Sequence, residues 1–171
     1  MLALNMNLQR GSLMNFDKNE LLKTLQSLPD IVEKYVENIP EELLDRKRSA
    51  TAWTIREHLN HIVDVQEMLY QRLVKIRDEE NPVITPYFPD KEDPAAGYKS
   101  PKDACKRYRE IREKQILLVN QLKESDFNKK AAHKEYEEYS IPIILNHMIF
   151  HEYWHMCRLE ELWLTRDEYF E

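Results

Sequence analysis

Three histidines stand at intervals of four near the end of the chain, in the stretch HMIFHEYWH from His147 to His155. Residues four apart on a helix have Cβ atoms about 5–6 Å apart, so two imidazoles can share one divalent ion at about 2.0–2.1 Å from each nitrogen. His151, Glu152 and His155 also satisfy H-E-x-x-H, in which two histidines bind zinc and the glutamate is the base of a metalloprotease. The spacing therefore indicates a metal site. It does not by itself say whether the protein is a metalloprotease or another kind of metal-dependent protein.

The rest of the chain does not meet the demands of a metalloprotease. Metzincins continue with a glycine and a third histidine, where this chain has Arg158 and Glu161. Enzymes that take a glutamate ligand from a later helix need more chain than the 16 residues that follow His155. No alternating strand pattern upstream offers an edge for pairing a peptide substrate. The H-E-x-x-H metalloprotease is kept only as a remote alternative.

The histidine-bearing segment is predicted to be a helix over residues 140–164. Ser140 can cap it, and a proline is tolerated in its first turn. At 100° per residue His151 and His155 lie on the same apolar stripe as Met148, so both imidazoles are expected to point into the fold. His147 lies about 40° to one side of His151. The alternative without a metal is that the inward histidines only pack and hydrogen-bond to neighbours.

Three further amphipathic helices are predicted upstream, over residues 17–39, 54–76 and 100–122. N-cap signals open all three, with a capping box at Thr54 and Glu57 in the second. Pro29 predicts a kink in the first. Four of the prolines and Gly97 fall within residues 81–99, which predicts an irregular crossover, and residues 124–139 form a polar connection. The pattern predicts an all-α four-helix bundle with a long crossover between helices two and three.

The second helix offers two histidines as a third metal ligand. His58 lies nearer the centre of the apolar seam, whereas His61 lies near the edge of a broader apolar arc that includes Val65 and Met68. Periodicity alone therefore slightly favours His58 and leaves both open.

Length and composition exclude several classes of protein. The chain of 171 residues is the size of one domain, predicted over 1–171 with 1–15 as a loose extension. It has no apolar run of about 20 residues and no secretory signal, and Cys105 and Cys157 are too few for a disulfide framework, so we expect a cytoplasmic protein that does not enter a membrane. A net charge of −6 argues against nucleic acid, and two glycines are too few for a G-x-G-x-x-G or Walker loop.

Two stretches carry a resemblance to a known family. IPEELLDRKRSATAWTIREHLNHIVDVQ and LNHMIFHEYWHMCRLEEL resemble the DinB/YfiT-like family, whose motifs they follow in order. Trp53-Thr54 and Asp64 set the register, so the resemblance implies that the helix-two ligand is His61 rather than His58. It likewise implies that His151 and His155 are the other two ligands. The chain departs from the pattern at Cys157-Arg158, where many members have Gly-Gln.

The resemblance implies a metal-dependent transferase or hydrolase with zinc or nickel at a three-histidine site, and a homodimer. It implies thiol-dependent, S-transferase-like chemistry on a small electrophile, with a low-molecular-weight thiol such as bacillithiol or mycothiol as cosubstrate. Asp64, Glu152, His147 and Arg158 are candidates for catalysis or substrate contact by proximity in sequence. A non-catalytic metal-binding bundle that acts as a sensor or interaction module is the main alternative.

Overall fold

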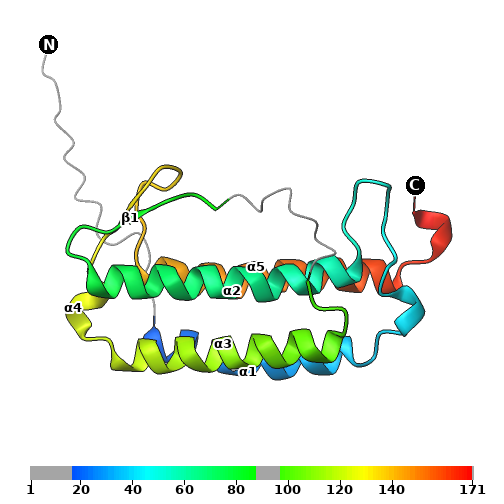
Figure 1. Ribbon diagram of the computed structural model, residues 1–171, viewed down its shortest axis with the longest axis horizontal. Coiled ribbons are helices and arrows are strands. Elements are labelled where there is room, and N and C mark those ends of the chain that lie inside the picture. Colours follow the sequence, from blue (N-terminus) through cyan, green and yellow to red (C-terminus); the bar gives the residue numbers. More distant parts are fainter. Residues whose placement is uncertain (1–16, 88–96, 171) are drawn as a thin grey trace, which may run out of the picture.

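The computed structural model describes residues 17–87 and 97–170, so the predicted extension over residues 1–15 lies outside the described residues. Four long helices form a bundle: α1 (Lys18–Val36), α2 (Ile55–Asp78), α3 (Pro101–Gln121) and α5 (Ile141–Leu164) (Figure 1). This confirms the prediction of an all-α four-helix bundle. No helix in the described part of the chain is both long and apolar enough to cross a membrane.

Three of the four long helices begin with the predicted capping hydrogen bond, whereas Ser140, at the N-cap position of α5, makes no such side-chain bond. The Asp17 carboxylate accepts hydrogen bonds from the first backbone amides of α1, and Thr54 and Glu57 form the reciprocal capping box of α2. The Ser100 hydroxyl accepts from the amide of Asp103, with a proline in the first turn of α3. α1 continues through the buried Pro29 to Val36. Local sequence therefore determines where most of the bundle helices begin.

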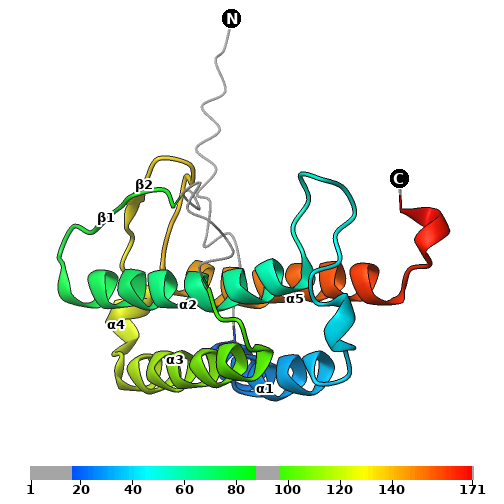
Figure 2. The same cartoon turned by 45° about the vertical axis from the view of Figure 1, so that its right-hand side comes forward.

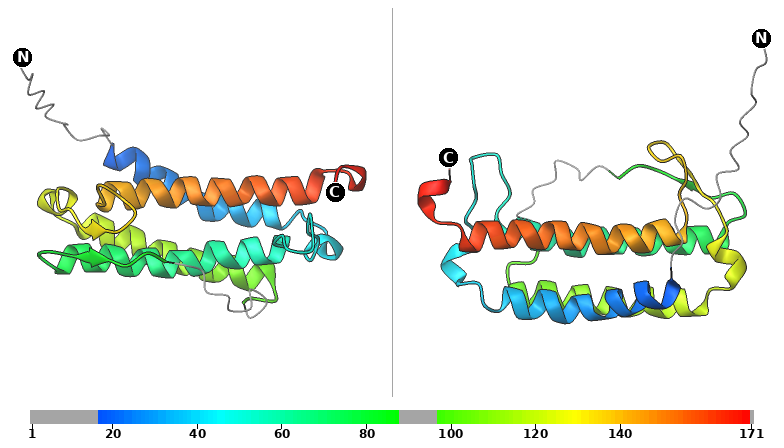
Figure 3. Two further views of the ribbon diagram at one scale, coloured as in Figure 1. Left: turned by 90° about the horizontal axis from the view of Figure 1, so that it is seen from above. Right: turned by 180° about the vertical axis from the view of Figure 1, so that it is seen from behind.

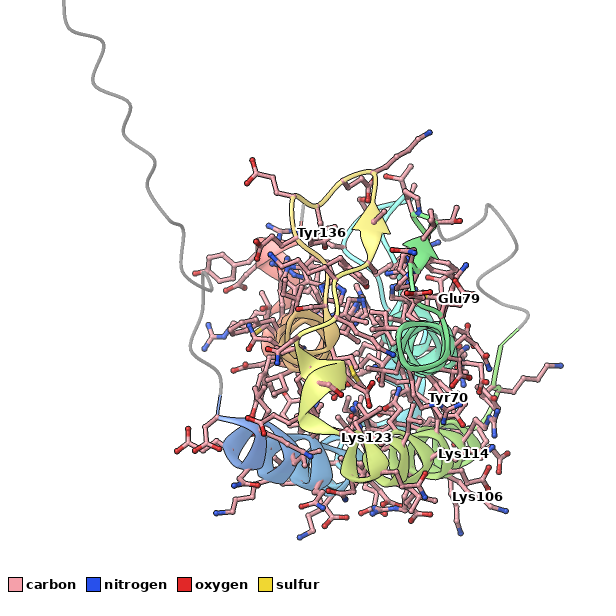
Figure 4. All side chains as sticks on the ribbon, turned by 90° about the vertical axis from the view of Figure 1, so that its left-hand side faces the viewer. Tyr70, Glu79, Lys106, Lys114, Lys123 and Tyr136 are labelled. Carbon is pink, nitrogen blue, oxygen red and sulfur yellow. The ribbon has the colours of Figure 1, made fainter. Side chains whose placement is uncertain are left out.

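The four helices lie in two layers, with α2 beside α5 in one layer and α1 beside α3 in the other (Figures 2 and 3). α2 and α1 each pack against both α3 and α5, so α1 and α2 occupy opposite corners although they are consecutive in the chain (Figure 4). α2 and α3 are neighbours that run in the same direction, whereas α2 and α5 are antiparallel. Because a parallel neighbour is reached only by returning along the bundle, a long connection between α2 and α3 is required.

Short elements lie within the crossover that was predicted to be irregular and within the polar connection before α5. The crossover contains β1 (Val83–Ile84), which pairs in parallel with β2 (Ala132–His133) of the connection before α5, in register Val83 to Ala132. The connection between α3 and α5 also contains the single-turn helix α4 (Glu124–Phe127). Two 3₁₀ turns lie elsewhere, at Glu41–Leu43 and Asp167–Tyr169. The prediction of an irregular crossover was wrong at β1. A two-residue strand is too short to show a period of two, and its partner is about fifty residues away in the chain.

The apolar core consists of two clusters at opposite ends of the bundle. Leu25, Leu69 and Met148 belong to one cluster, and Val32 and Leu59 belong to the other. Between them, all the long helices except α1 contribute buried polar side chains: Gln66, Arg112, Gln115, Glu152 and His155. A polar layer thus crosses the middle of an otherwise apolar bundle.

Candidate metal centre

Three imidazoles converge between the neighbouring helices α2 and α5. The ligand nitrogens of His61, His151 and His155 all lie within 4.8 Å of one another. His151 Nε2 is 3.3 Å from His61 Nε2 and 3.2 Å from His155 Nε2. Two nitrogens bound at about 2.0–2.1 Å to a tetrahedral ion are about 3.3 Å apart. The residues present therefore fit one divalent ion with three nitrogen ligands.

Burial keeps these imidazoles neutral at physiological pH. Desolvation, followed by the neighbouring histidines, lowers the pKa of His151 to about 3 and that of His155 to about 2. Desolvation also lowers the pKa of His61. Neutral imidazole is the form that binds a metal ion, so no proton has to be removed from these residues at pH 7.

His58 lies behind the cluster. It is the deeper of the two α2 histidines, which is why periodicity favours it, but its Nδ1 faces His155 Nδ1 at 2.9 Å. His61, three residues later and half-buried, presents Nε2 to His151. Depth of burial thus identifies His58 as the residue nearer the core, whereas the position of α5 beside α2 brings His61 to the cluster.

Two tryptophans surround the imidazoles. The ring of Trp53, in the turn before α2, lies 4.8 Å from the ring of His61 and stacks on that of His155 at 6.0 Å. The ring of Trp154, on α5, meets His155 edge-on at 4.7 Å. Both indole rings therefore contribute to the packing around the imidazoles.

Glu152 does not face the cluster. Its carboxylate is fully buried in the polar layer, where it forms an ion pair with Arg112 and accepts a hydrogen bond from the Tyr108 hydroxyl. Burial raises its pKa, against the effect of Arg112. A base that is held in the core by an arginine cannot take a proton from a ligand between His61 and His151. The H-E-x-x-H pattern therefore lacks the catalytic geometry of a metalloprotease.

The other three sequence candidates are not part of the cluster. The ring of His147 is 5.7 Å from that of His151, one turn along α5. Asp64 is exposed, its pKa is raised by partial desolvation, and within the described residues it has no hydrogen-bond or ion-pair partner. Arg158 pairs with Glu161 at 2.6 Å and lies over the ring of Trp154. None of these three side chains belongs to the group of converging nitrogens. Cys157 is exposed and takes no part.

Sequence reasoning missed the polar layer next to the site. Arg112 donates to Gln66 Oε1 at 3.1 Å, and the Gln115 amide donates to the Gln66 carbonyl at 2.8 Å. Gln66 and Gln115 occupy positions in the apolar seams of α2 and α3. A polar residue at such a position predicts a buried hydrogen-bonded layer, so this part of the layer could have been recognised from the sequence. Arg112 gave no such signal because it lies beside the seam rather than on it.

The metal-free protein should lose stability as the pH falls from 7 to 5. In the unfolded chain histidine has its ordinary pKa of about 6.5, whereas in the folded protein the pKa values of His58, His151 and His155 are about 4, 3 and 2. The unfolded state therefore binds more protons in this range, and linkage lowers the free energy of unfolding as the pH falls. Above pH 7 both states are neutral and the effect vanishes.

Urea midpoints measured between pH 5 and 8 test this prediction. His155→Asn, which retains a polar side chain of moderate size but cannot titrate, should show a smaller fall than the wild type. A urea midpoint that stays constant from pH 7 to 5 in the wild type would contradict the prediction. An equal fall of the midpoint with pH in the variant and the wild type would contradict it as well.

The sequence of the chain matches a known protein family. The sequence model of the DinB superfamily matches residues 24–157. A protein of Oceanobacillus iheyensis named putative metal-dependent hydrolase is 26% identical over 158 residues, which cover 92% of each chain. A Bacillus cereus protein of the same name is 24% identical over 142 residues, 82% of each chain.

Solved structures support the same fold. YfiT from Bacillus subtilis, described as a probable metal-dependent hydrolase with an unusual four-helix bundle topology, superposes with a TM-score of 0.76 at 21% identity, over 86% of this chain and 88% of YfiT. A second DinB-like protein of Bacillus subtilis, YjoA, superposes with a TM-score of 0.57 at 15% identity, over 84% of this chain and 90% of that one. With the family match across most of its length, the chain belongs to the DinB superfamily.

Proposed function

We propose that this protein is a metal-dependent enzyme that adds a low-molecular-weight thiol to a small electrophile, with zinc or nickel held by His61, His151 and His155. The observation that carries the proposal is the convergence of three neutral imidazoles with Nε2 separations of 3.2 and 3.3 Å. The names of the relatives support the metal-dependent part. Three protein ligands leave a coordination position open, which is typical of catalytic rather than structural zinc sites.

A divalent ion at this position supplies a Lewis acid that lowers the pKa of a bound water or thiol. The chain itself contributes the three neutral nitrogens, and the indoles of Trp53 and Trp154 pack against the imidazoles. Trp154 is 53% exposed, its ring meets that of His155, and the Arg158 guanidinium lies over it. We expect these two side chains, Trp154 and Arg158, to contact the electrophile.

We favour a thiol over water as the nucleophile because the glutamate of the H-E-x-x-H pattern is not available as a base, and we assign Asp64 and His147 to substrate contact rather than to proton transfer. Hydrolysis at a metal site generally uses a carboxylate or histidine as a general base. Glu152 is bound to Arg112 in the core, and no carboxylate of the described residues joins the three nitrogens within the same distance. A divalent ion held by the three imidazoles would lower the pKa of a thiol far enough for its proton to pass to solvent without such a base. The sulfur–carbon bond would form as the bond from that carbon to a halide, or to the epoxide oxygen, breaks, and the halide or the oxygen would keep the electron pair.

The test uses protein purified without a histidine tag and loaded with zinc or nickel. We expect thioether formation, measured by mass spectrometry, when a thiol such as bacillithiol, mycothiol or glutathione is supplied with an epoxide or a halogenated electrophile. Chelated protein is the matched control and should show only the uncatalysed rate. Hydrolysis of an ester or amide panel without thiol consumption would overturn the thiol proposal. Metal-dependent stabilisation with no turnover of either panel would favour the non-catalytic metal-binding module.

A further inference from the structure

A fourth histidine makes a direct contact with the cluster without belonging to it. His58 is 6% exposed, and its Nδ1 lies 2.9 Å from Nδ1 of His155. We propose that His58 is a positioning residue that holds His155 in the tautomer whose Nε2 lone pair faces His61 and His151. The inference deepens the proposed function and rests on its metal site.

The direction of the His58–His155 hydrogen bond decides whether His155 can bind an ion. A neutral imidazole has one N–H, so one of the two Nδ1 atoms donates and the other accepts. When His155 donates from Nδ1, its Nε2 has a free lone pair 3.2 Å from His151 Nε2. When His58 donates instead, the proton of His155 lies on Nε2 and occupies the place of the ion. His58 therefore has to act as the acceptor.

Packing holds the His58 ring in the orientation that this contact requires. The ring of Trp53 meets it at 5.3 Å and 62°, and that of Trp154 meets it at 6.2 Å and 68° from the other helix. His58 also lies in the first turn of α2, directly after the capping box of Thr54 and Glu57. A ring held by two indoles in a capped turn has little freedom to leave its partner.

His155 differs in this respect from the neighbouring ligand on α5. His151 Nδ1 is buried and has no hydrogen-bond partner within the described residues. Metal-binding histidines generally donate their second N–H to an acceptor that fixes ring orientation and tautomer, and loss of that acceptor typically costs about 10–100-fold in metal affinity. His58 provides this acceptor for His155.

Two variants of similar size separate the acceptor from simple packing. The side-chain amide oxygen that H58N introduces can accept a hydrogen bond near the position of the imidazole Nδ1, whereas the isobutyl group that H58L introduces cannot. Zinc affinity is measured by competition with a chelator at pH 7.5. We expect H58L to bind zinc about 10–100-fold more weakly than the wild type and H58N to stay within about threefold. Equal affinity of H58L and wild type, or an equal loss in both variants, would overturn the inference.

Nitrogen NMR of the metal-free protein reads the tautomer directly. We expect His155 to be protonated at Nδ1 in the wild type and in H58N, and to become a mixture of tautomers in H58L. Protonation of wild-type His155 at Nε2 would overturn the inference whatever the zinc affinities. A wild-type protein that takes up neither zinc nor nickel overturns the proposed function instead, and there the NMR result alone decides the role of His58.

Discussion

Replacing His61 with asparagine is expected to abolish stoichiometric zinc binding. His61 is the ligand that α2 contributes, and its Nε2 lies 3.3 Å from that of His151. If about 10–16 kcal/mol of zinc affinity is shared among the three protein ligands, loss of one should weaken binding on the order of 100- to 10,000-fold. Asparagine removes the Nε2 position while keeping a polar side chain of moderate size. Metal content after gel filtration and chelator competition measure the effect.

His147→Asn is the matched control for this experiment. His147 is also half-buried and lies one turn from His151, but it does not belong to the cluster. Its replacement should leave the metal content at the wild-type value. Equal loss of zinc in both variants would place the ion elsewhere among the α5 histidines, and retention of zinc in H61N would remove α2 from the site.

Replacing Arg112 with methionine is expected to lower the free energy of unfolding by about 3–5 kcal/mol. The Arg112 and Glu152 side chains are 2% and 0% exposed, so the substitution leaves a buried carboxylate without its cation. The hydroxyl of Tyr108 and the amide oxygen of Gln66 lose a donor at the same time. Urea unfolding of the metal-free protein, followed by circular dichroism, measures the change.

Two further variants test the cause of this loss. Arg107→Met removes an ion pair with Glu67 at 2.9 Å in which both side chains are one-third to one-half exposed, and it should cost about 0–1 kcal/mol. The double variant Arg112→Met/Glu152→Met removes both buried charges and should recover most of the stability lost in the single variant. A double variant as unstable as the single one would show that packing, rather than the unpaired carboxylate, explains the loss.

Local interactions made the helices predictable. Capping residues such as Asp17, Thr54 and Ser100 act on amides within three positions of themselves, so they can be recognised without knowledge of the fold. The seams of α2 and α3 were equally visible. The β1–β2 pairing was not, because it exists only where the end of α2 and the connection before α5 meet.

The candidate site divides in the same way. His151 and His155 are four residues apart on one helix, and that spacing alone brings their rings together. The choice between His58 and His61 depends on which helix lies beside α2, a contact that periodicity within α2 does not contain. Glu152 illustrates the point most clearly, since its partner Arg112 is forty residues away on α3.

The sequence by itself determined the four helices, the need for a long crossover and the pair of histidines on α5, because caps, periodicity and i to i+4 spacing act within one helix. Periodicity left His58 and His61 open, the family resemblance implied His61, and the structure brings His61 into the cluster. Only the tertiary structure decided that His58 contacts His155 from behind and that Glu152 belongs to the core. The physical reason is that α1 and α2 occupy opposite corners of the bundle, which leaves α2 between α3 and α5. One face of α2 therefore meets the histidines of α5, while its next face meets the polar side chains of α3.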